Sequence, residues 1–262
     1  MTAVCFPGTA DATAIQDHET STGTLLDGKI SYTQFRTGNR TGFEPVLLAA
    51  SLPVRRGERV LEAGCGAGAG LLCLNARMPD VEITGIELDA ATANLARLNI
   101  AARPGEQKKL HVITANLLTL PPPPSTERVH HAFANPPWYP TDGSASPHPR
   151  RDIARRAGNQ TMAAWIKTLR LHLRERGTLT LALPASRLAE TLGALDKYRF
   201  GSTDVFPLWP KQGQEARILL VRGRLGGRAG SRLLSGLTLH EQDGSLTPHA
   251  EQILRDGMPL LF

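Results

Sequence analysis

The residues with the clearest chemical capability are four consecutive ones, Asn135-Pro136-Pro137-Trp138, which follow an apolar segment ending at Ala134. Two prolines stiffen this loop and fix the directions of the Asn135 side chain and the Pro136 carbonyl. Both groups offer hydrogen-bond acceptors, so together they suit the two hydrogens of one amino group. The indole of Trp138 provides a flat surface of the kind on which bases stack. The pattern predicts a site for a planar amino group conjugated to a π-system.

Such an amino nitrogen is a poor nucleophile because its lone pair is delocalised. Two aimed acceptors favour a pyramidal nitrogen and orient it toward an electrophile. We therefore expect Asn135, Pro136, Pro137 and Trp138 to form the catalytic segment. No general base is expected, because the proton on the product nitrogen can pass to water.

A glycine-rich turn, Gly64-Cys65-Gly66-Ala67-Gly68, lies between an apolar run and a helical pattern. Glycines let the backbone turn sharply and approach a ligand, and the N-terminus of the following helix offers free N–H groups. Glu87 ends the next apolar run, about 20 residues beyond the glycines, where an acid can accept hydrogen bonds from ribose hydroxyls. The pattern predicts a pocket for a nucleotide-type cofactor, either a dinucleotide or S-adenosylmethionine (SAM).

The elements that must position these residues alternate between short apolar runs and helical patterns. Strands are expected at 59–63, 81–86, 110–114, 131–134, 178–183, 204–208 and 218–222. Helices are expected at 90–101, capped by Asp89, and at 162–174. This order predicts an α/β fold with a seven-stranded, mostly parallel sheet, helices on both faces and an antiparallel last strand.

The spacing of the turn, Glu62-x-Gly64-x-Gly66-x-Gly68, resembles the first motif of class I methyltransferases rather than the G-x-G-x-x-G of dehydrogenases. The resemblance implies a Rossmann-like fold and SAM as the cofactor. It places Glu62 near the ammonium of the cofactor's methionine and Glu87 at its ribose. Asn116 stands where such enzymes usually carry an Asp that binds the adenine amino group. The residues implied to contact the cofactor are Arg40, Glu62, Gly64, Cys65, Gly66, Gly68, Glu87, Leu88, Asn116, Leu117 and Asn135.

The catalytic segment resembles the N-P-P-[YFW] signature of amino-methyltransferases. Adenine N6, cytosine N4 and the side-chain amide of glutamine all present a planar conjugated amino group. The signature therefore indicates the reacting group and leaves the acceptor molecule open.

The segment from Gln34 to Ala50 resembles the Q-P-x-x-G-Y-R-x-x-x-D-x-x-L-L-A-A opening of the family that includes bacterial tRNA adenine N6-methyltransferases acting on valine tRNA. Phe35, Asn39 and Glu44 depart from that pattern. Segments at 177–184, 206–210, 216–223 and 237–240 are also similar, so the resemblance extends over residues 24–256. It implies methyl transfer from SAM to the exocyclic N6 of adenine in RNA, with tRNA as the expected substrate.

Local charge agrees with an RNA partner. The chain has 30 Lys and Arg against 24 Asp and Glu, a net charge of +6, and residues 150–176 contain eight basic and two acidic residues. We expect Arg150, Arg151, Arg155 and Arg156, just after the catalytic segment, to contact RNA phosphates. A second group without an intervening acid comprises Arg217, Arg222, Arg224, Arg228 and Arg232.

Two other functions remain open. A protein glutamine N5-methyltransferase shares the expected fold and motif but usually carries an added N-terminal helical domain, for which about 55 residues before the first core strand are too few. The second is a non-catalytic module that binds SAM and RNA. Methyl transfer that depends on Asn135 and Glu87 would distinguish the enzyme from such a module.

Composition sets the wider limits. A hydrophobic content of 41% excludes a chain that is disordered throughout, and no apolar stretch reaches the roughly 20 residues of a membrane span. No leader is evident, so a cytoplasmic protein without membrane or metal partners is expected, with a monomer favoured. Three cysteines without a C-x-x-C pair argue against a metal site, and Cys65 is expected to be a packing residue.

The expected organisation is a flexible tail at 1–23 followed by one methyltransferase domain at 24–262. Within that domain we expect an N-terminal cap segment (24–56), a catalytic core (57–224) and a C-terminal hairpin extension (225–262).

Overall fold

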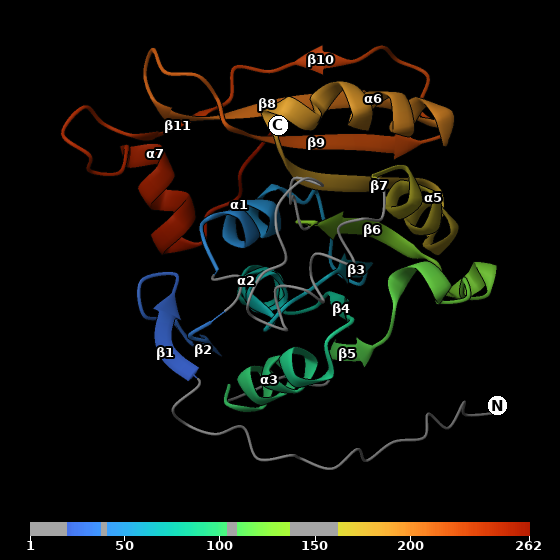
Figure 1. The fold of residues 1–262 in the computed structure, drawn as a ribbon, viewed down its shortest axis with the longest axis horizontal. Coiled ribbons are helices and arrows are strands. Elements are labelled where there is room, and N and C mark those ends of the chain that lie inside the picture. The colour runs from blue at the N-terminus through green and yellow to red at the C-terminus, as the bar shows by residue number, and fades with distance from the viewer. Residues whose placement is uncertain (1–19, 38–40, 104–108, 137–161) are drawn as a thin grey trace.

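The computed structural model describes residues 20–37, 41–103, 109–136 and 162–262. A nine-stranded sheet with the order β10-β8-β9-β7-β6-β3-β4-β5, in which β11 also pairs with β8, runs through the molecule (Figure 1). Its strands are β3 (Arg59–Ala63), β4 (Glu82–Glu87), β5 (Leu110–Thr114), β6 (Val129–Ala134), β7 (Leu173–Pro184), β8 (Phe200–Lys211), β9 (Ile218–Leu225), β10 (Arg232–Leu233) and β11 (Leu237–His240). A separate antiparallel hairpin joins β1 (Thr20–Leu25) to β2 (Ile30–Phe35).

All strands of the large sheet run in one direction except β9, which is antiparallel to both β7 and β8. The mostly parallel sheet with an antiparallel last core strand is confirmed, and β10 and β11 extend it along β8. The helices are α1 (Glu44–Ser51), α2 (Ala69–Arg77), α3 (Ala90–Ala101), α5 (Met162–His172), α6 (Leu188–Lys197) and α7 (Pro248–Glu251), with short turns η3 (Leu117–Thr119), η4 (Ser125–Glu127), η5 (Ala185–Arg187) and η6 (Gln252–Asp256).

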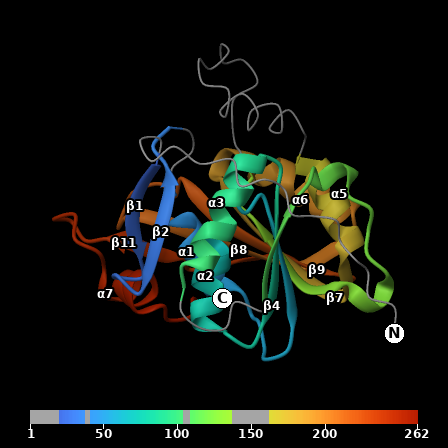
Figure 2. The same ribbon diagram turned by 90° about the horizontal axis from the view of Figure 1, so that it is seen from below.

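Helices cover both faces of the sheet (Figure 2). Side chains alternate between the faces along each strand, so Val60 joins the core beneath α1 and α2 while its neighbour Leu61 joins the core beneath α5 and α6. Phe133 and Ala132 divide in the same way on β6. The hairpin β1–β2 lies on the side of α2 and α3 (Figure 2).

Most core strands begin or end a few residues away from the expected bounds, and other differences concern the ends of the chain and α5. Strand β1 includes residues 20–23, which were expected in the tail, because its backbone pairs with β2 over its whole length. Helix α5 ends at His172, before the expected residue 174, because Leu173 already pairs with Val129 of β6. After Leu225, β10 and β11 each pair parallel with β8 and so extend the large sheet, while an antiparallel bridge joins His240 to Leu246 beyond β11.

Candidate functional site

The glycine-rich loop connects β3 to α2 and is held against the end of β4. The backbone N–H groups of Gly64 and Cys65 both donate to the carbonyl of Ile86, at 2.8 and 3.0 Å. Gly64, Gly66 and Gly68 have φ angles of +68°, +56° and +90°, which glycine alone adopts without strain. Among the described residues, no heavy atom lies within 4 Å of a Cβ built on Gly66, so this part of the structure leaves space for a ligand beside the loop.

Glu87 ends β4 and joins this loop to the start of α3. Its carboxylate accepts from the backbone N–H of Gly66 at 3.0 Å and from that of Asp89 at 2.9 Å. Burial raises the pKa of Glu87, and these N–H donors oppose the rise. Asp89 caps α3 as expected, because its carboxylate accepts from the backbone N–H of Thr92 at 2.9 Å.

Glu62 is buried beneath the first turn of α2. The backbone N–H of Leu71 donates to its carboxylate, while burial raises the pKa of Glu62 well above the ordinary value. A side chain on Gly70 would overlap this carboxylate, so α2 packs directly on it. The Oε2 atom has no hydrogen-bond partner among the described residues. The site therefore contains a buried carboxylate oxygen that is free to accept.

The catalytic segment begins beside this loop. Ala63 of β3 pairs with Ala134 of β6, so Gly64 and Asn135 follow adjacent strands at the same level of the sheet. Asn135 is exposed, and its side chain makes no hydrogen bond within the described part of the chain, whereas Pro136 is buried. An uncommitted amide thus stands next to the glycine-rich loop.

The other expected cofactor residues occupy varied positions. Asn116 accepts from the backbone N–H of Leu118 at 3.0 Å and so caps η3, and the side chain of Leu117 is buried in the core beneath α5. Leu88, directly after β4, is 40% exposed. Cys65 is buried, and burial raises the pKa of its thiol well above the usual range, which fits a packing role.

Several expected site residues lie outside the described residues. These are Arg40, Pro137, Trp138, Arg150, Arg151, Arg155 and Arg156.

The structure adds two packing residues that the sequence analysis did not single out. A Cβ on Gly85 of β4 would lie 2.7 Å from the Cys65 sulfur, so only glycine lets the loop pack on this strand. Trp165 of α5 packs on the other side of the loop, 3.2 Å from a Cβ built on Gly64. A glycine inside a strand pattern was the available signal for Gly85, whereas the contact of Trp165 had no local signal.

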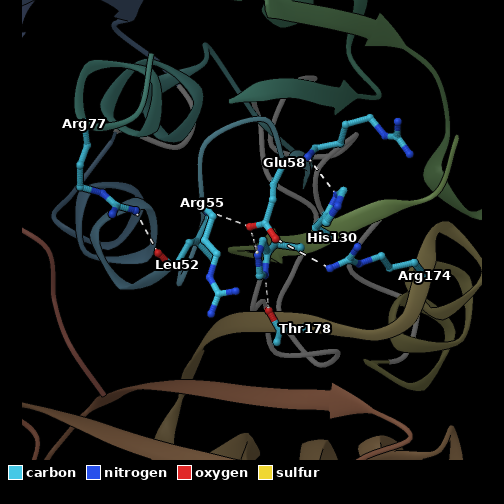
Figure 3. Close-up of polar contacts among 9 residues, drawn as sticks. Leu52, Arg55, Glu58, Arg77, His130, Arg174 and Thr178 are labelled. Carbon is cyan, nitrogen blue, oxygen red and sulfur yellow. Dashed lines mark hydrogen bonds and ion pairs between the residues drawn. The ribbon is translucent and has the colours of Figure 1, made fainter. Parts of the chain in front are cut away.

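A second polar cluster lies near the amino ends of the strands, away from the loop (Figure 3). The buried ring of His131 contacts Glu58 at 2.9 Å and Thr178 at 2.7 Å. Arg174 approaches the Glu58 carboxylate at 3.7 Å, and His130 accepts from the backbone N–H of Arg59 at 3.1 Å. Because the buried imidazole of His131 is bonded to the partly buried carboxylate of Glu58, we interpret the cluster as structural.

The described residues contain no group of three or more His, Cys, Asp or Glu side chains placed to hold a metal. None of the described helices is long and apolar enough to cross a bilayer.

Comparison with protein families identifies a match that covers most of the core. A family model described as N-6 DNA Methylase matches residues 45–196, which include the loop, Glu87 and the catalytic segment.

Two curated relatives extend the similarity. A tRNA1(Val) (adenine(37)-N6)-methyltransferase of Yersinia pestis (strain Pestoides F) is 27% identical over 248 residues, covering 88% of this chain and 94% of the relative. A protein of the same name from Bacteroides thetaiotaomicron is 27% identical over 183 residues, covering 70% and 75%.

Solved structures share the fold. A predicted O-methyltransferase from Agrobacterium tumefaciens superposes with a TM-score of 0.69 at 23% identity, covering 83% of this chain and 98% of the other. A SAM-dependent O-methyltransferase from Thermotoga maritima gives a TM-score of 0.52 at 16% identity, covering 74% and 69%. The expected Rossmann-like methyltransferase fold is thereby confirmed.

Proposed function

Because the chain belongs to the N-6 DNA Methylase family, and is by that family and its fold a SAM-dependent methyltransferase, we propose that it methylates the exocyclic N6 of an adenine in tRNA. The family description names DNA, but the relatives that align over most of this chain are named as tRNA enzymes. The observation that carries the chemistry is the free Asn135 amide, one residue beyond the pairing of Ala134 with Ala63 and hence beside the glycine-rich loop.

The residues at this edge of the sheet fit SAM. The free Oε2 of Glu62 is the group expected for the cofactor's ammonium. Glu87 can accept from the ribose hydroxyls while it retains its bonds from the N–H groups of Gly66 and Asp89, which supports its proposed role. The exposed side chain of Leu88 offers an apolar surface for the adenine. Asn116 Oδ1 keeps a second lone pair beyond its capping bond, which suits the adenine amino group. When bound, SAM supplies the methyl group as an electrophile attached to a sulfonium.

Asn135 and Pro136 act on the acceptor. The amide oxygen of Asn135 and the carbonyl of Pro136 each accept one hydrogen of the target amino group. This arrangement localises the nitrogen lone pair and directs it toward the cofactor, because both acceptors belong to a stiff loop. After transfer, the nitrogen releases one proton to water. The loop beyond Pro136, with Trp138, is proposed to supply the surface on which the base stacks.

Labelled methyl transfer to total tRNA, followed by nucleoside mass analysis, tests the proposal. We expect N6-methyladenosine as the product. A labelled cytosine would contradict adenine as the acceptor, and a labelled glutamine in added protein would favour the glutamine methyltransferase.

The role of Asn135 needs its own variants. Asn135→Ala should lower kcat by about a hundredfold or more and leave the affinity for S-adenosylhomocysteine (SAH) within about twofold, because the amide, although it adjoins the cofactor, forms its hydrogen bond with the acceptor. Asn135→Asp keeps an acceptor at the same place and should retain more activity than Asn135→Ala. Full activity of both variants would show that the acceptor pair is wrongly assigned.

The proposed RNA contacts of Arg150, Arg151, Arg155 and Arg156 rest on sequence. Replacing all four by Ala should raise the KM for tRNA and flatten its dependence on salt, because fewer counterions are released when fewer phosphates are bound. An unchanged KM would place the RNA on another surface.

A further inference from the structure

Asn99 of α3 forms hydrogen bonds with the edge of the hairpin strand β2 that does not pair with β1. The backbone N–H of Thr33 donates to Asn99 Oδ1 at 2.9 Å, and Asn99 Nδ2 donates to the Thr33 carbonyl at 2.8 Å. These two bonds reproduce the pairing that a neighbouring strand would make. The side chain of one residue thus replaces a third strand and attaches the hairpin to α3.

The same amide also holds the glycine-rich loop. The second hydrogen of Asn99 Nδ2 goes to the carbonyl of Ala67 at 2.9 Å. On the other side of that peptide, the N–H of Gly68 donates to the Cys65 carbonyl at 2.9 Å. The peptide plane between Ala67 and Gly68, just before α2 begins, is therefore fixed from both sides.

This arrangement requires an amide. Asn99 is 4% exposed, and both hydrogens of its Nδ2 atom point at carbonyl oxygens. A carboxylate would place an acceptor against two acceptors, and an alkyl side chain would leave the Thr33 and Ala67 groups without partners.

A second side chain of the hairpin reaches the same region. Tyr32 is buried, and its hydroxyl contacts the hydroxyl of Thr41 at 2.8 Å. Burial raises the pKa of Tyr32 to about 12, and the hydrogen bond with Thr41 opposes the rise. Tyr32 belongs to the same buried core as Cys65 of the loop and Cys73 of α2.

We propose that Asn99 is a positioning residue for the cofactor: its amide couples the docking of hairpin β1–β2 to the conformation of the glycine-rich loop. The docked hairpin then stabilises the conformation of the glycine-rich loop that binds SAM. This inference rests on the proposed binding of SAM at that loop.

Titration calorimetry with SAH, together with steady-state kinetics on tRNA, tests the coupling in the full-length protein. Asn99→Ala should raise the Kd for SAH and the KM for SAM by about tenfold, the worth of one buried hydrogen bond. The kcat at saturating SAM should stay within about twofold, because the acceptor site is untouched. Absence of SAH binding by the wild-type protein would overturn the proposed function together with this inference.

Asn75 of α2 provides a matched control. It is also a buried Asn on a helix of this face, but its Nδ2 has no partner among the described residues and its Oδ1 receives one long contact of 3.4 Å from Arg103. Asn75→Ala should therefore leave the Kd for SAH unchanged. Equal effects of Asn75→Ala and Asn99→Ala on SAH affinity would reduce Asn99 to a stabilising residue and overturn the proposal.

Thr33→Pro tests whether the hairpin itself acts on the loop, because it changes the hairpin and leaves the bond from Asn99 to Ala67 in place. It remains informative if Asn99→Ala does not fold. The N–H of Thr33 points at Asn99 and not at β1, so proline removes one bond to Asn99 and keeps the backbone pairing of the hairpin. It also removes the exposed hydrogen bond between the hydroxyls of Thr22 and Thr33, so Thr33→Val is measured beside it as the control for that loss. We expect the Kd for SAH to rise several-fold, about half the logarithmic effect of Asn99→Ala. An unchanged Kd for Thr33→Pro would show that the hairpin does not act on the loop.

Discussion

Glu87 illustrates how one side chain organises the site at the scale of a residue. Its two carboxylate oxygens accept from N–H groups on opposite sides, Gly66 in the loop and Asp89 at the start of α3. A carboxylate can do this because each oxygen is only an acceptor. The residue thus shapes the loop, and in the proposed function it also offers an acceptor to the ribose of SAM.

Replacing Glu87 by Gln should weaken SAH binding by roughly tenfold to a hundredfold, because the amide nitrogen of Gln would face one of the two N–H donors. Calorimetry measures the change. Glu82→Gln is the matched control, since Glu82 is an exposed glutamate at the other end of β4. Unchanged SAH affinity in Glu87→Gln would remove Glu87 from the cofactor site.

Strand β4 shows what the scale of an element adds. The loop after β3 does not stand free, because Cys65 packs into the space that the missing side chain of Gly85 leaves on β4. Leu71 of α2 fills the rest of that space, with Cδ1 at 2.8 Å from a Cβ built on Gly85. Strand, loop and helix are therefore joined at one position without a side chain.

Gly85→Ala should lower the free energy of unfolding by about 1 to 3 kcal/mol, because the added methyl overpacks this contact. Urea denaturation measures the loss. Gly193→Ala in α6 is the control, since no heavy atom of the described part of the chain lies within 4 Å of its Cβ position and a helix favours alanine over glycine by up to about 1 kcal/mol. A Gly85→Ala variant as stable as the wild type would show that the loop can move away from β4 at no cost.

At the scale of the whole molecule, the C-terminal segment contacts α1 and β9, which are distant from it in the sequence. The backbone N–H of Leu260 donates to the Ala50 carbonyl at 2.9 Å, so the C-terminal segment packs on the end of α1. Nearby, Arg222 of β9 lies with its guanidinium carbon 3.9 Å from the centre of the Phe262 ring and donates to the Ser51 carbonyl at 3.1 Å. Burial lowers the pKa of Arg222 to about 10. Arg222 therefore links β9 to the end of α1 and to the C-terminal residue, which is a structural role.

The polar cluster of Figure 3 predicts how stability depends on pH. Burial lowers the pKa of His131 below its ordinary 6.5, so the unfolded chain takes up a proton first as the pH falls. Stability should therefore decrease as the pH falls below 6.5. The pKa of Glu58 is lowered from 4.5, mainly by the Arg55 N–H and by His131, which outweigh burial. The contribution of Glu58 is lost only as the pH falls below 4.5.

Thermal unfolding between pH 7.5 and pH 5 checks this prediction. His131→Gln does not titrate and should show a shallower loss of Tm on acidification than the wild type. Part of the slope should remain, because burial also lowers the pKa values of His130 and His172. An equal slope in His131→Gln and wild type would contradict the assignment to His131.

Local chemistry allowed the sequence by itself to determine the glycine-rich loop, the cap at Asp89 and the seven core strands. Positive φ angles, a carboxylate that caps a helix and the alternation of apolar residues depend on neighbours within a few positions. The same applies to the placement of Glu87 and Asn135, since each directly follows a strand whose end was readable.

Only the tertiary structure decided which distant groups meet. Arg232, in a run of arginines without an acid, pairs with Asp204 across the sheet at 2.8 Å, and Asn99 bonds to Thr33 and Ala67, 66 and 32 positions away. The apolar spacing of Trp165, Leu169 and Leu173 would continue α5, but the register of β7 on β6 ends that helix at His172. Such contacts depend on how strands and helices align in space, and local residue patterns do not encode that alignment.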